Sequence, residues 1–239
     1  MEISPDVPTP NHRAADVVVR TVEADIRSGR LTDGATLPSE RDLVANFGVS
    51  RTVIREAMRI LSARGLVETR PRHRPVVRQP NADAAFGALE AIVPQLLTQP
   101  GGIRNLFDTR ILIEAGLVRS AALNASKEGI AALQSALDEN EATIPNSDEF
   151  YRTDVAFHRV LYELSGNPML PALHKAYTVW LAPQWSQMPR LSERNKMNYS
   201  AHVQIFDGIL RRDPDAAEQA LRTHLETAWE HVSRTFDGL

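Results

Sequence analysis

Residues 38–70 read PSERDLVANFGVSRTVIREAMRILSARGLVETR, and this stretch predicts two short helices joined by a tight turn. Ser39 suits the N-cap of the first helix, because Asp42 follows it three positions later in the spacing of a capping box. Gly48 ends that helix, since glycine adopts the left-handed conformation that so sharp a turn requires. Ser50 opens the second helix. The apolar positions of this helix follow a helical period and are Ile54, Ala57, Met58 and Leu61.

The opposite face of the second helix is polar, beginning at its N-terminal end, and carries Arg51, Thr52, Arg55 and Arg59. Residues 41–78 contain nine arginines, three acidic residues and no lysine. The planar guanidinium group of arginine suits both guanine edges and phosphates, whereas lysine offers only a point charge. A helix pair with a solvated arginine face is also a common scaffold. The local charge nevertheless favours a helix-turn-helix whose second helix enters the DNA major groove.

The segments on either side of this helix pair are also patterned. A helix is expected over about residues 13–28, and two short strands over residues 66–68 and 76–78. The turn between the strands contains two prolines and no glycine, so we expect a short or irregular hairpin. Residues 1–11 are rich in proline and lack periodicity, which predicts a disordered tail.

The composition bounds the class of protein. Apolar residues make up 43% of the 239 residues, enough for a packed core, and cysteine is absent, which excludes disulfides and thiolate metal sites. The sequence shows neither a signal peptide nor a run of 18 apolar residues, so we expect a cytoplasmic protein without a membrane partner. The net charge of −3 divides into +3 over residues 1–80 and −6 over the remainder. A basic N-terminal part followed by an acidic remainder favours an N-terminal DNA-binding domain.

The remainder of the chain predicts a helical bundle. Its breaks contain proline, glycine or polar residues, and Asp213 followed by Pro214 is a strong helix start. The fold class is therefore mainly α, with a seven-helix bundle after the DNA-binding head. The expected helices are residues 83–98, 103–124, 127–143, 147–165, 169–186, 192–212 and 215–236.

Four polar residues in this bundle have the spacing of a metal site. Asp154 and His158 lie four positions apart in a helical segment and so share one face. His202 lies 11 residues before Asp213, and His224 lies 11 residues after it. If Asp213 marks the turn of an antiparallel hairpin, both imidazoles lie at the same height, about 16 Å from the turn. One carboxylate and three imidazoles suit Zn²⁺, Ni²⁺ or Mn²⁺, although an isolated buried histidine is more often a hydrogen-bonded core residue.

Two sets of motifs resemble known families. LPSERDLVANFGVSRTVIREAMRILSARGLV and the basic segment after it resemble the winged helix-turn-helix of the GntR family of bacterial transcriptional regulators, although the family's wing usually has glycines at its tip. DTRILIEAGLVRSAA, FYRTDVAFHRVLYELSGNPML, and AHVQIFDGIL followed by AAEQALRTHL resemble the FCD effector domain of its FadR-like branch. The expected organisation is a disordered tail at 1–11, a winged helix-turn-helix at 12–79, a linker at 80–82, and an all-helical domain for effector binding and dimerisation at 83–239.

The resemblance implies a metal ion, Zn²⁺ in the first place, with coordination positions open to a small carboxylate effector of the sugar-acid or dicarboxylate type. The metal-binding members use an Asp-x3-His pair and two later histidines, which Asp154, His158, His202 and His224 match. Arg110 occupies the position of an inward arginine that clamps an acid group. The alternative is a surface pair between Arg110 and Glu114, four positions apart.

The resemblance also implies a homodimeric regulator, commonly a repressor, that reads an inverted repeat in a double-stranded DNA operator. An effector would change the placement of the two heads and so the operator affinity. The residues expected to contact DNA are Ser50, Arg51, Thr52 and Arg55 in the recognition helix, Arg41 on the backbone, and Arg72 or Arg74 in the wing.

Other interpretations stay open. A metal-dependent hydrolase needs a general base beside the metal-bound water, and no HExxH motif or spare glutamate accompanies the four ligands. The metal could also be purely structural. Tyr177, Trp180 and Trp185 either line a cavity or belong to the core, whereas His174 and His231 are expected to be structural or exposed.

Overall fold

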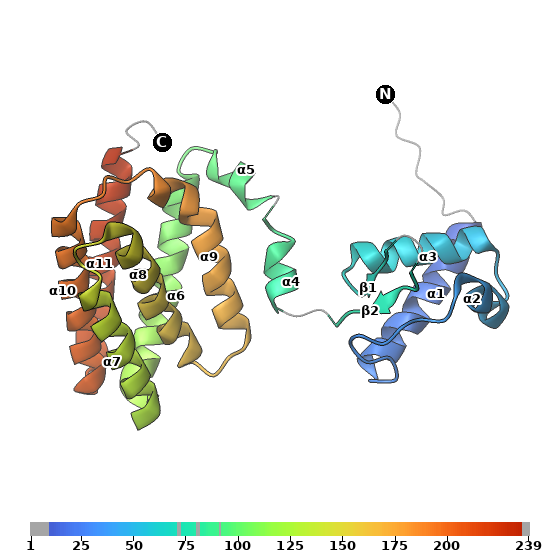
Figure 1. Ribbon diagram of the computed structural model, residues 1–239, viewed down its shortest axis with the longest axis horizontal. Helices are drawn as coiled ribbons and strands as arrows, with labels where there is room; N and C mark the ends of the chain where they lie inside the picture. Colours follow the sequence, from blue (N-terminus) through green and yellow to red (C-terminus); the bar gives the residue numbers. More distant parts are fainter. Residues whose placement is uncertain (1–9, 71–72, 80–81, 91, 236–239) are drawn as a thin grey trace. The chain divides into compact units, whose positions relative to one another are not determined.

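The computed structural model describes residues 10–70, 73–79, 82–90 and 92–235, and the chain divides into two compact units, Met1–Ala84 and Ala85–Leu239 (Figure 1). The mainly α fold class is confirmed, because helices dominate both units. Within these described ranges, every helix is too short or too polar to cross a membrane.

The N-terminal unit is a helix-turn-helix with a two-stranded wing. Its elements are α1 (Pro10–Arg27), α2 (Glu40–Phe47), α3 (Arg51–Ala63), β1 (Val67–Glu68) and β2 (Val76–Val77). The capping predicted for α2 and α3 is confirmed: the Ser39 hydroxyl accepts from the backbone N–H of Asp42 at 3.2 Å, and the Ser50 hydroxyl accepts from that of Val53 at 3.3 Å. Gly48 ends α2 with φ of 63°, in the left-handed region.

One apolar core holds these elements together. Helix α1 packs along α3, and the antiparallel strands β1 and β2 pair Val67 with Val77 beside them. The periodic positions predicted for α3 are buried, and they are Ile54, Ala57, Met58 and Leu61. Because this apolar face is buried, the polar face at the N-terminal end of α3 is exposed, which is the arrangement that a recognition helix requires.

Some boundaries differ from the sequence-based expectation or lie outside the described residues. Helix α1 begins at Pro10, because proline is well tolerated in a first helical turn, so residues 10–11 are helical. The rest of the expected tail, residues 1–9, lies outside the described residues, as do residues 71–72 of the wing and residues 80–81 of the linker.

The second unit is helical throughout. Short helices α4 and α5 lead into six longer ones that match the expected segments after residue 100 (Figure 1). The elements are α4 (Ala82–Gly87), α5 (Val93–Leu97), α6 (Gly102–Asn124), α7 (Lys127–Ala142), α8 (Ser147–Glu163), α9 (Met169–Ser186), α10 (Ser192–Leu210) and α11 (Pro214–Thr235).

The single helix expected over residues 83–98 is wrong. The chain forms α4 and α5 there, separated by turns at residues 88–90. Pro94 explains the break, because proline has no N–H to donate and its ring clashes with the carbonyl four residues earlier. Pro94 instead occupies the first turn of α5, where an N–H has no helical partner to lose.

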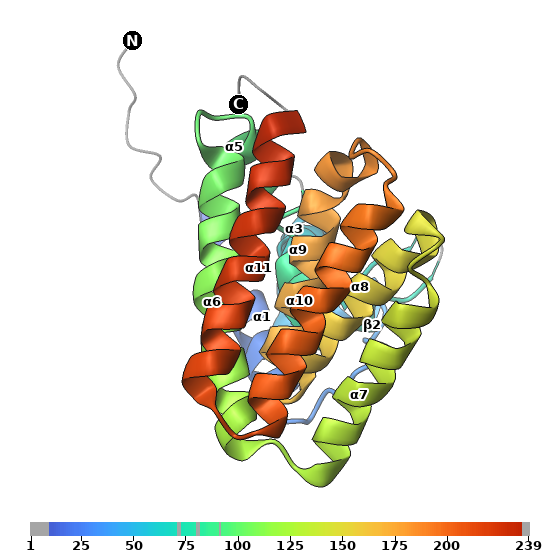
Figure 2. The same ribbon diagram turned by 90° about the vertical axis from the view of Figure 1, so that its left-hand side faces the viewer.

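Helices α10 and α11 form a close hairpin that lies beside α6 (Figure 2). Asp213 is the predicted cap, and its carboxylate accepts from the backbone N–H of Ala216 at 3.0 Å. Arg212 has φ of 60°, and its guanidinium donates to the carbonyls of Ala122 at 3.2 Å and Ala125 at 2.6 Å, where α6 ends. The turn of the hairpin is therefore joined to the end of α6.

Gly208 sets how closely the two helices of the hairpin approach. A Cβ atom at this position would lie 2.7 Å from the nitrogen and 2.8 Å from the Cα of Ala217. Both atoms belong to the backbone, so a larger residue can be accommodated only if the helices separate. The spacing of α10 and α11, and with it the positions of the side chains between them, depends on this glycine.

We expect Gly208→Ala to lower the free energy of unfolding by about 1–3 kcal/mol, the usual cost of overpacking. Denaturant unfolding followed by circular dichroism measures it. Gly116→Ala is the matched control, because Gly116 lies in the interior of α6 with open space around its Cα. The control should be neutral or about 0.5–1 kcal/mol more stable, since alanine favours the helix. Equal stability of Gly208→Ala and the wild type would contradict the expected clash.

Candidate metal centre

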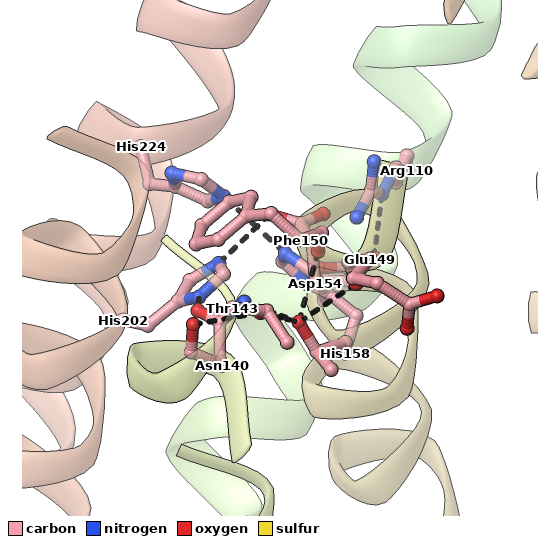
Figure 3. Close-up of polar contacts among 11 residues, drawn as sticks. Arg110, Asn140, Thr143, Glu149, Phe150, Asp154, His158, His202 and His224 are labelled. Carbon is pink, nitrogen blue, oxygen red and sulfur yellow. Dashed lines mark hydrogen bonds and ion pairs between the residues drawn. The ribbon is translucent and has the colours of Figure 1, made fainter. Parts of the chain in front are cut away.

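Asp154, His158, His202 and His224 meet between three helices (Figure 3). Asp154 and His158 come from α8, His202 from α10 and His224 from α11, and one ligand atom of each lies within 4.8 Å of the others. The Nε2 atoms of His158 and His224 are 3.3 Å apart, and Nε2 of His202 is 3.5 Å from Oδ1 of Asp154. The geometry thus brings together all four residues that the sequence pattern selected.

The cluster has the properties of a metal site rather than of a hydrogen-bonded core. Oδ1 of Asp154 and Nε2 of His202 are buried without a hydrogen-bond partner among the described residues. Buried polar atoms are rarely left unpaired, and a divalent cation between these atoms would pair both. The three imidazoles are fully or almost fully buried, whereas the side chain of Asp154 keeps 20% of its surface exposed. The residues present therefore fit a cation reached from the Asp154 side.

The protonation states also favour a metal. Burial, reinforced by neighbouring positive groups, holds the pKa of His202 and of His224 well below the ordinary histidine value. Both imidazoles are therefore neutral near pH 7, the form that binds metals. Burial raises the pKa of Asp154, although His158 and Arg110 lower it in part. A bound cation would oppose that rise, because it favours the ionised carboxylate.

Two further residues orient the imidazoles. Nδ1–H of His158 donates to Oε2 of Glu114 at 2.7 Å, and Nδ1–H of His202 donates to Oδ1 of Asn140 at 2.9 Å. The amide of Asn140 is itself fixed, because its Nδ2 donates to the hydroxyl of Thr153 at 3.0 Å. These bonds leave the Nε2 lone pairs facing the centre, the arrangement typical of metal-ligating histidines. Glu114 and Asn140 were not among the predicted site residues.

Arg110 and Glu114 form an ion pair, but the surface location considered for it is wrong. Nε of Arg110 donates to Oε1 of Glu114 at 2.6 Å, with Arg110 6% exposed and Glu114 fully buried. The hydroxyl of Tyr162 donates to the same oxygen at 3.2 Å. Burial by itself raises the pKa of Glu114, but Arg110 and His158 together hold it well below the ordinary value. Glu114 is therefore a buried carboxylate that joins Arg110 to His158.

A cavity of about 90 Å³ opens beside the cluster. Asp154 and His224 line it together with Arg110, whose Nε is bonded to Glu114 and whose terminal nitrogens make no hydrogen bond to the part of the chain that the structure describes. A ligand in the cavity can therefore contact both the metal ligands and the arginine. Other lining residues include Tyr151, Trp185, Arg190, Arg194, Asn198 and His231.

The remaining predicted side chains divide between this cavity and the core. Trp185 lines the cavity, whereas Tyr177 and Trp180 are buried in an apolar cluster with Leu181. His174 is buried against Tyr162, with ring centroids 4.8 Å apart, so it is structural as expected.

His231 differs from the expectation. It lines the cavity, and its Nε2 is buried without a hydrogen-bond partner among the described residues. The sequence does carry a signal for it, because His231 follows His224 by about two helical turns on α11 and so lies on the same face of that helix.

In the first unit the basic residues predicted to contact DNA are accessible. Arg51, Thr52 and Arg55 are exposed in the first turns of α3, directly after its N-cap Ser50. Within the described ranges, Arg51 and Arg55 form no ion pair or side-chain hydrogen bond that would occupy them. Arg41 and Arg74 are exposed near this helix-turn-helix, whereas Arg72 lies outside the described residues.

Comparisons with known proteins place both units. The family model "Bacterial regulatory proteins, gntR family" matches residues 14–77, and the model "FCD domain" matches residues 105–227. The HTH-type transcriptional repressor NanR of Salmonella typhimurium is 39% identical over 234 residues, covering 97% of this chain and 88% of that protein, and the same repressor of Salmonella typhi is equally similar. Both units are thus covered by family models and by a relative of matching length.

Two solved structures share the fold. Streptococcus agalactiae GntR superimposes with a TM-score of 0.60 at 22% identity, covering 92% of this chain and 99% of that one. E. coli McbR/YncC superimposes with a TM-score of 0.52 at 15% identity, covering 93% and 98%. The arrangement of a helix-turn-helix unit followed by a helical unit is therefore common to all three proteins.

Proposed function

Because the chain belongs to the GntR family of bacterial regulatory proteins and carries an FCD domain, we propose that it is a repressor whose operator affinity changes when a small organic acid binds at a metal centre in its helical unit. Family membership identifies the chain as a transcription regulator rather than an enzyme, so the hydrolase alternative is set aside. The name of the NanR relatives supports repression. The observation that carries the proposal is the buried cluster with two unpaired ligand atoms beside an arginine-lined cavity.

In this proposal the metal is held by Asp154, His158, His202 and His224, with Zn²⁺ the leading choice and Ni²⁺ or Mn²⁺ compatible with the same donors. When bound, the ion would offer coordination positions to a carboxylate of the effector. Glu114 and Asn140 hold two imidazoles in place, and the terminal nitrogens of Arg110 donate to the acid group. The effector is a sugar acid or dicarboxylate small enough for the cavity.

The DNA-binding part of the proposal rests on the exposed face of α3. In this proposal Arg51, Thr52 and Arg55 contact bases and phosphates, and Ser50 contacts DNA at the start of the same helix. Arg41 contacts the DNA backbone, and Arg74 or Arg72 contacts DNA from the wing. A homodimer places two copies of α3 about a two-fold axis, so the operator is an inverted repeat. In this proposal residues 12–79 form the DNA-binding domain and residues 83–239 form the domain for effector binding and dimerisation, with residues 80–82 as the linker.

We expect Arg55→Ala to weaken operator binding by about 5- to 150-fold, the equivalent of about 1–3 kcal/mol for a lost guanine contact. Fluorescence anisotropy at fixed salt, with a fragment from upstream of the protein's own gene, measures it. Arg152→Ala is the matched control, because Arg152 is an exposed arginine of the helical unit, and it should bind like the wild type. Equal binding by Arg55→Ala and the wild type would remove Arg55 from the interface.

The regulatory part is tested by adding acids to the preformed DNA complex. A panel of sugar acids and dicarboxylates should contain compounds that change operator affinity in the metal-loaded protein and have no effect after chelation. Coupling between effector and DNA sites is typically about 5- to 150-fold. A purely structural metal predicts instead that no acid changes DNA binding, with or without chelator.

A further inference from the structure

The cavity beside the metal cluster is lined by two further arginines, Arg190 and Arg194, that have no role in the proposed function. Arg194, on α10, lines it and is half-buried, and its guanidinium makes no hydrogen bond or ion pair with any residue that the structure describes. The other two arginines of the cavity have carboxylate partners: Arg110 is paired with Glu114 at 2.6 Å and Arg190 with Asp148 at 3.3 Å. Arg194 is therefore the cavity arginine without a hydrogen bond or ion pair to the described residues, and its electrostatic partner is Asp154, a ligand of the proposed cation.

The balance of charge around the cavity favours an anion with more than one negative charge. Paired Arg110 and Arg190 contribute no net charge, and a divalent ion held by Asp154 and the three imidazoles would leave one positive charge, because histidines bind a metal in their neutral form. Arg194 adds a second. Burial and the neighbouring Arg190 lower the pKa of Arg194, although Asp154 raises it in part. An anion in the cavity would favour the charged form of Arg194.

Two neutral groups on the same cavity also lack partners. The hydroxyl of Tyr151 and Nε2 of His231 are buried, line the cavity, and have no hydrogen-bond partner among the described residues. Burial raises the pKa of Tyr151 to about 12, so its hydroxyl stays protonated and can donate. Buried polar atoms left unpaired in this way point to a missing polar partner. A protonated tyrosine hydroxyl can donate to an anion, so an anionic group is a suitable partner for it.

We propose that Arg194, Tyr151 and His231 form an anion subsite, and that the effector is a small dianion whose first carboxylate binds the metal and whose second anionic group binds Arg194. The inference rests on the proposed function, since it assigns the other end of the same ligand. Arg194 provides the charge-assisted hydrogen bonds, and Tyr151 and His231 complete the contacts of the second group. That group is a carboxylate or a phosphate, because the arginine fork suits both.

The test is calorimetry on the full-length, zinc-loaded protein with ligand pairs that differ only in the second charge. Succinate is compared with butyrate, and 2-phosphoglycolate with glycolate, so the two arms distinguish a carboxylate from a phosphate. In at least one of the two ligand pairs, the dianion should bind about tenfold tighter than its monoanion, or more, as expected for a buried charge-assisted hydrogen bond. Arg194→Gln should remove this preference and leave the affinity for the monoanion within about twofold of the wild type.

Three further variants test whether the preference for the dianion depends on the charge and position of Arg194 and on the hydroxyl of Tyr151. Arg211→Gln removes the same charge at the far end of α10, where Arg211 is exposed and paired with Asp207, so it should keep the full preference. Arg194→Lys keeps the charge and should keep part of the preference. Tyr151→Phe should weaken the dianion by about 2- to 12-fold, the value of one hydrogen bond, and provides an independent test if Arg194→Gln does not fold.

The possible failures are distinguishable. Metal-dependent binding of mono- and dianions with equal affinity would overturn the anion subsite and leave the proposed function intact. An equal loss of both ligands in Arg194→Gln, with Arg211→Gln unaffected, would also overturn it, because Arg194 would then serve the first carboxylate. If neither class of acid binds the wild type, with or without zinc, the proposed function itself fails.

Discussion

Replacing Glu114 by alanine is expected to lower the free energy of unfolding of the helical unit by about 3–5 kcal/mol. Glu114 is fully buried, and its carboxylate accepts from Arg110 at 2.6 Å, from His158 at 2.7 Å and from Tyr162 at 3.2 Å. Removing it leaves the guanidinium of Arg110 buried without an anion and removes the hydrogen-bond acceptor of His158. The loss is far larger than that of a surface pair because water cannot replace the missing charge.

Denaturant unfolding of the metal-free protein measures this effect, so that metal binding does not contribute. Glu226→Ala is the matched control: Glu226 accepts from Arg104 at 2.9 Å on the surface, and its loss should cost no more than about 1 kcal/mol. Replacing both partners, with Arg110→Met and Glu114→Leu together, should recover most of the stability, because no buried charge is left alone. A double variant as unstable as Glu114→Ala would show that the charge of Arg110 is not the cause.

The second large effect is expected from removing the metal. The four residues of the proposed centre lie on three helices and come together only in the folded chain, so we expect zinc to bind the folded state and stabilise it by mass action. With free zinc at about 1,000 times its dissociation constant, the gain is about 4 kcal/mol. Chelation should therefore lower the melting temperature of the helical unit by several degrees.

The matched variant is His202→Ala, which removes one ligand and should make the melting temperature insensitive to both zinc and chelator. Glu114→Ala should be intermediate, since loss of a residue that orients a ligand typically weakens metal binding by about 10- to 100-fold. Differential scanning calorimetry with zinc, with chelator and with zinc restored measures all three proteins. A wild type whose melting temperature is unchanged by chelator would contradict the metal centre.

The features predictable from sequence are those fixed by local geometry. The caps at Ser39 and Ser50 and the left-handed Gly48 act within a few residues, so the helix-turn-helix follows from residues 38–70 alone. The level placement of His202 and His224 also follows locally, because the turn at Asp213 defines the hairpin between them.

The features that escaped prediction depend on which helices pack together. Glu114 on α6 meets His158 on α8, and Asn140 on α7 meets His202 on α10, at sequence separations of 44 and 62 residues. A glutamate four residues after an arginine looks the same in sequence whether the pair is buried or exposed. The same holds for Arg194, whose importance comes from the cavity around it.

The contacts of α6 have one more consequence. Arg212, at the turn of the hairpin, donates to two carbonyls at the C-terminal end of this helix, and Glu114 in its middle is bonded to His158. Helix α6 is thus held at two separate points by the elements that carry His158, His202 and His224, which restricts its tilting. A rearrangement of α8 or of the α10–α11 hairpin is therefore expected to shift α6 as well, since these contacts join its middle and its C-terminal end to them.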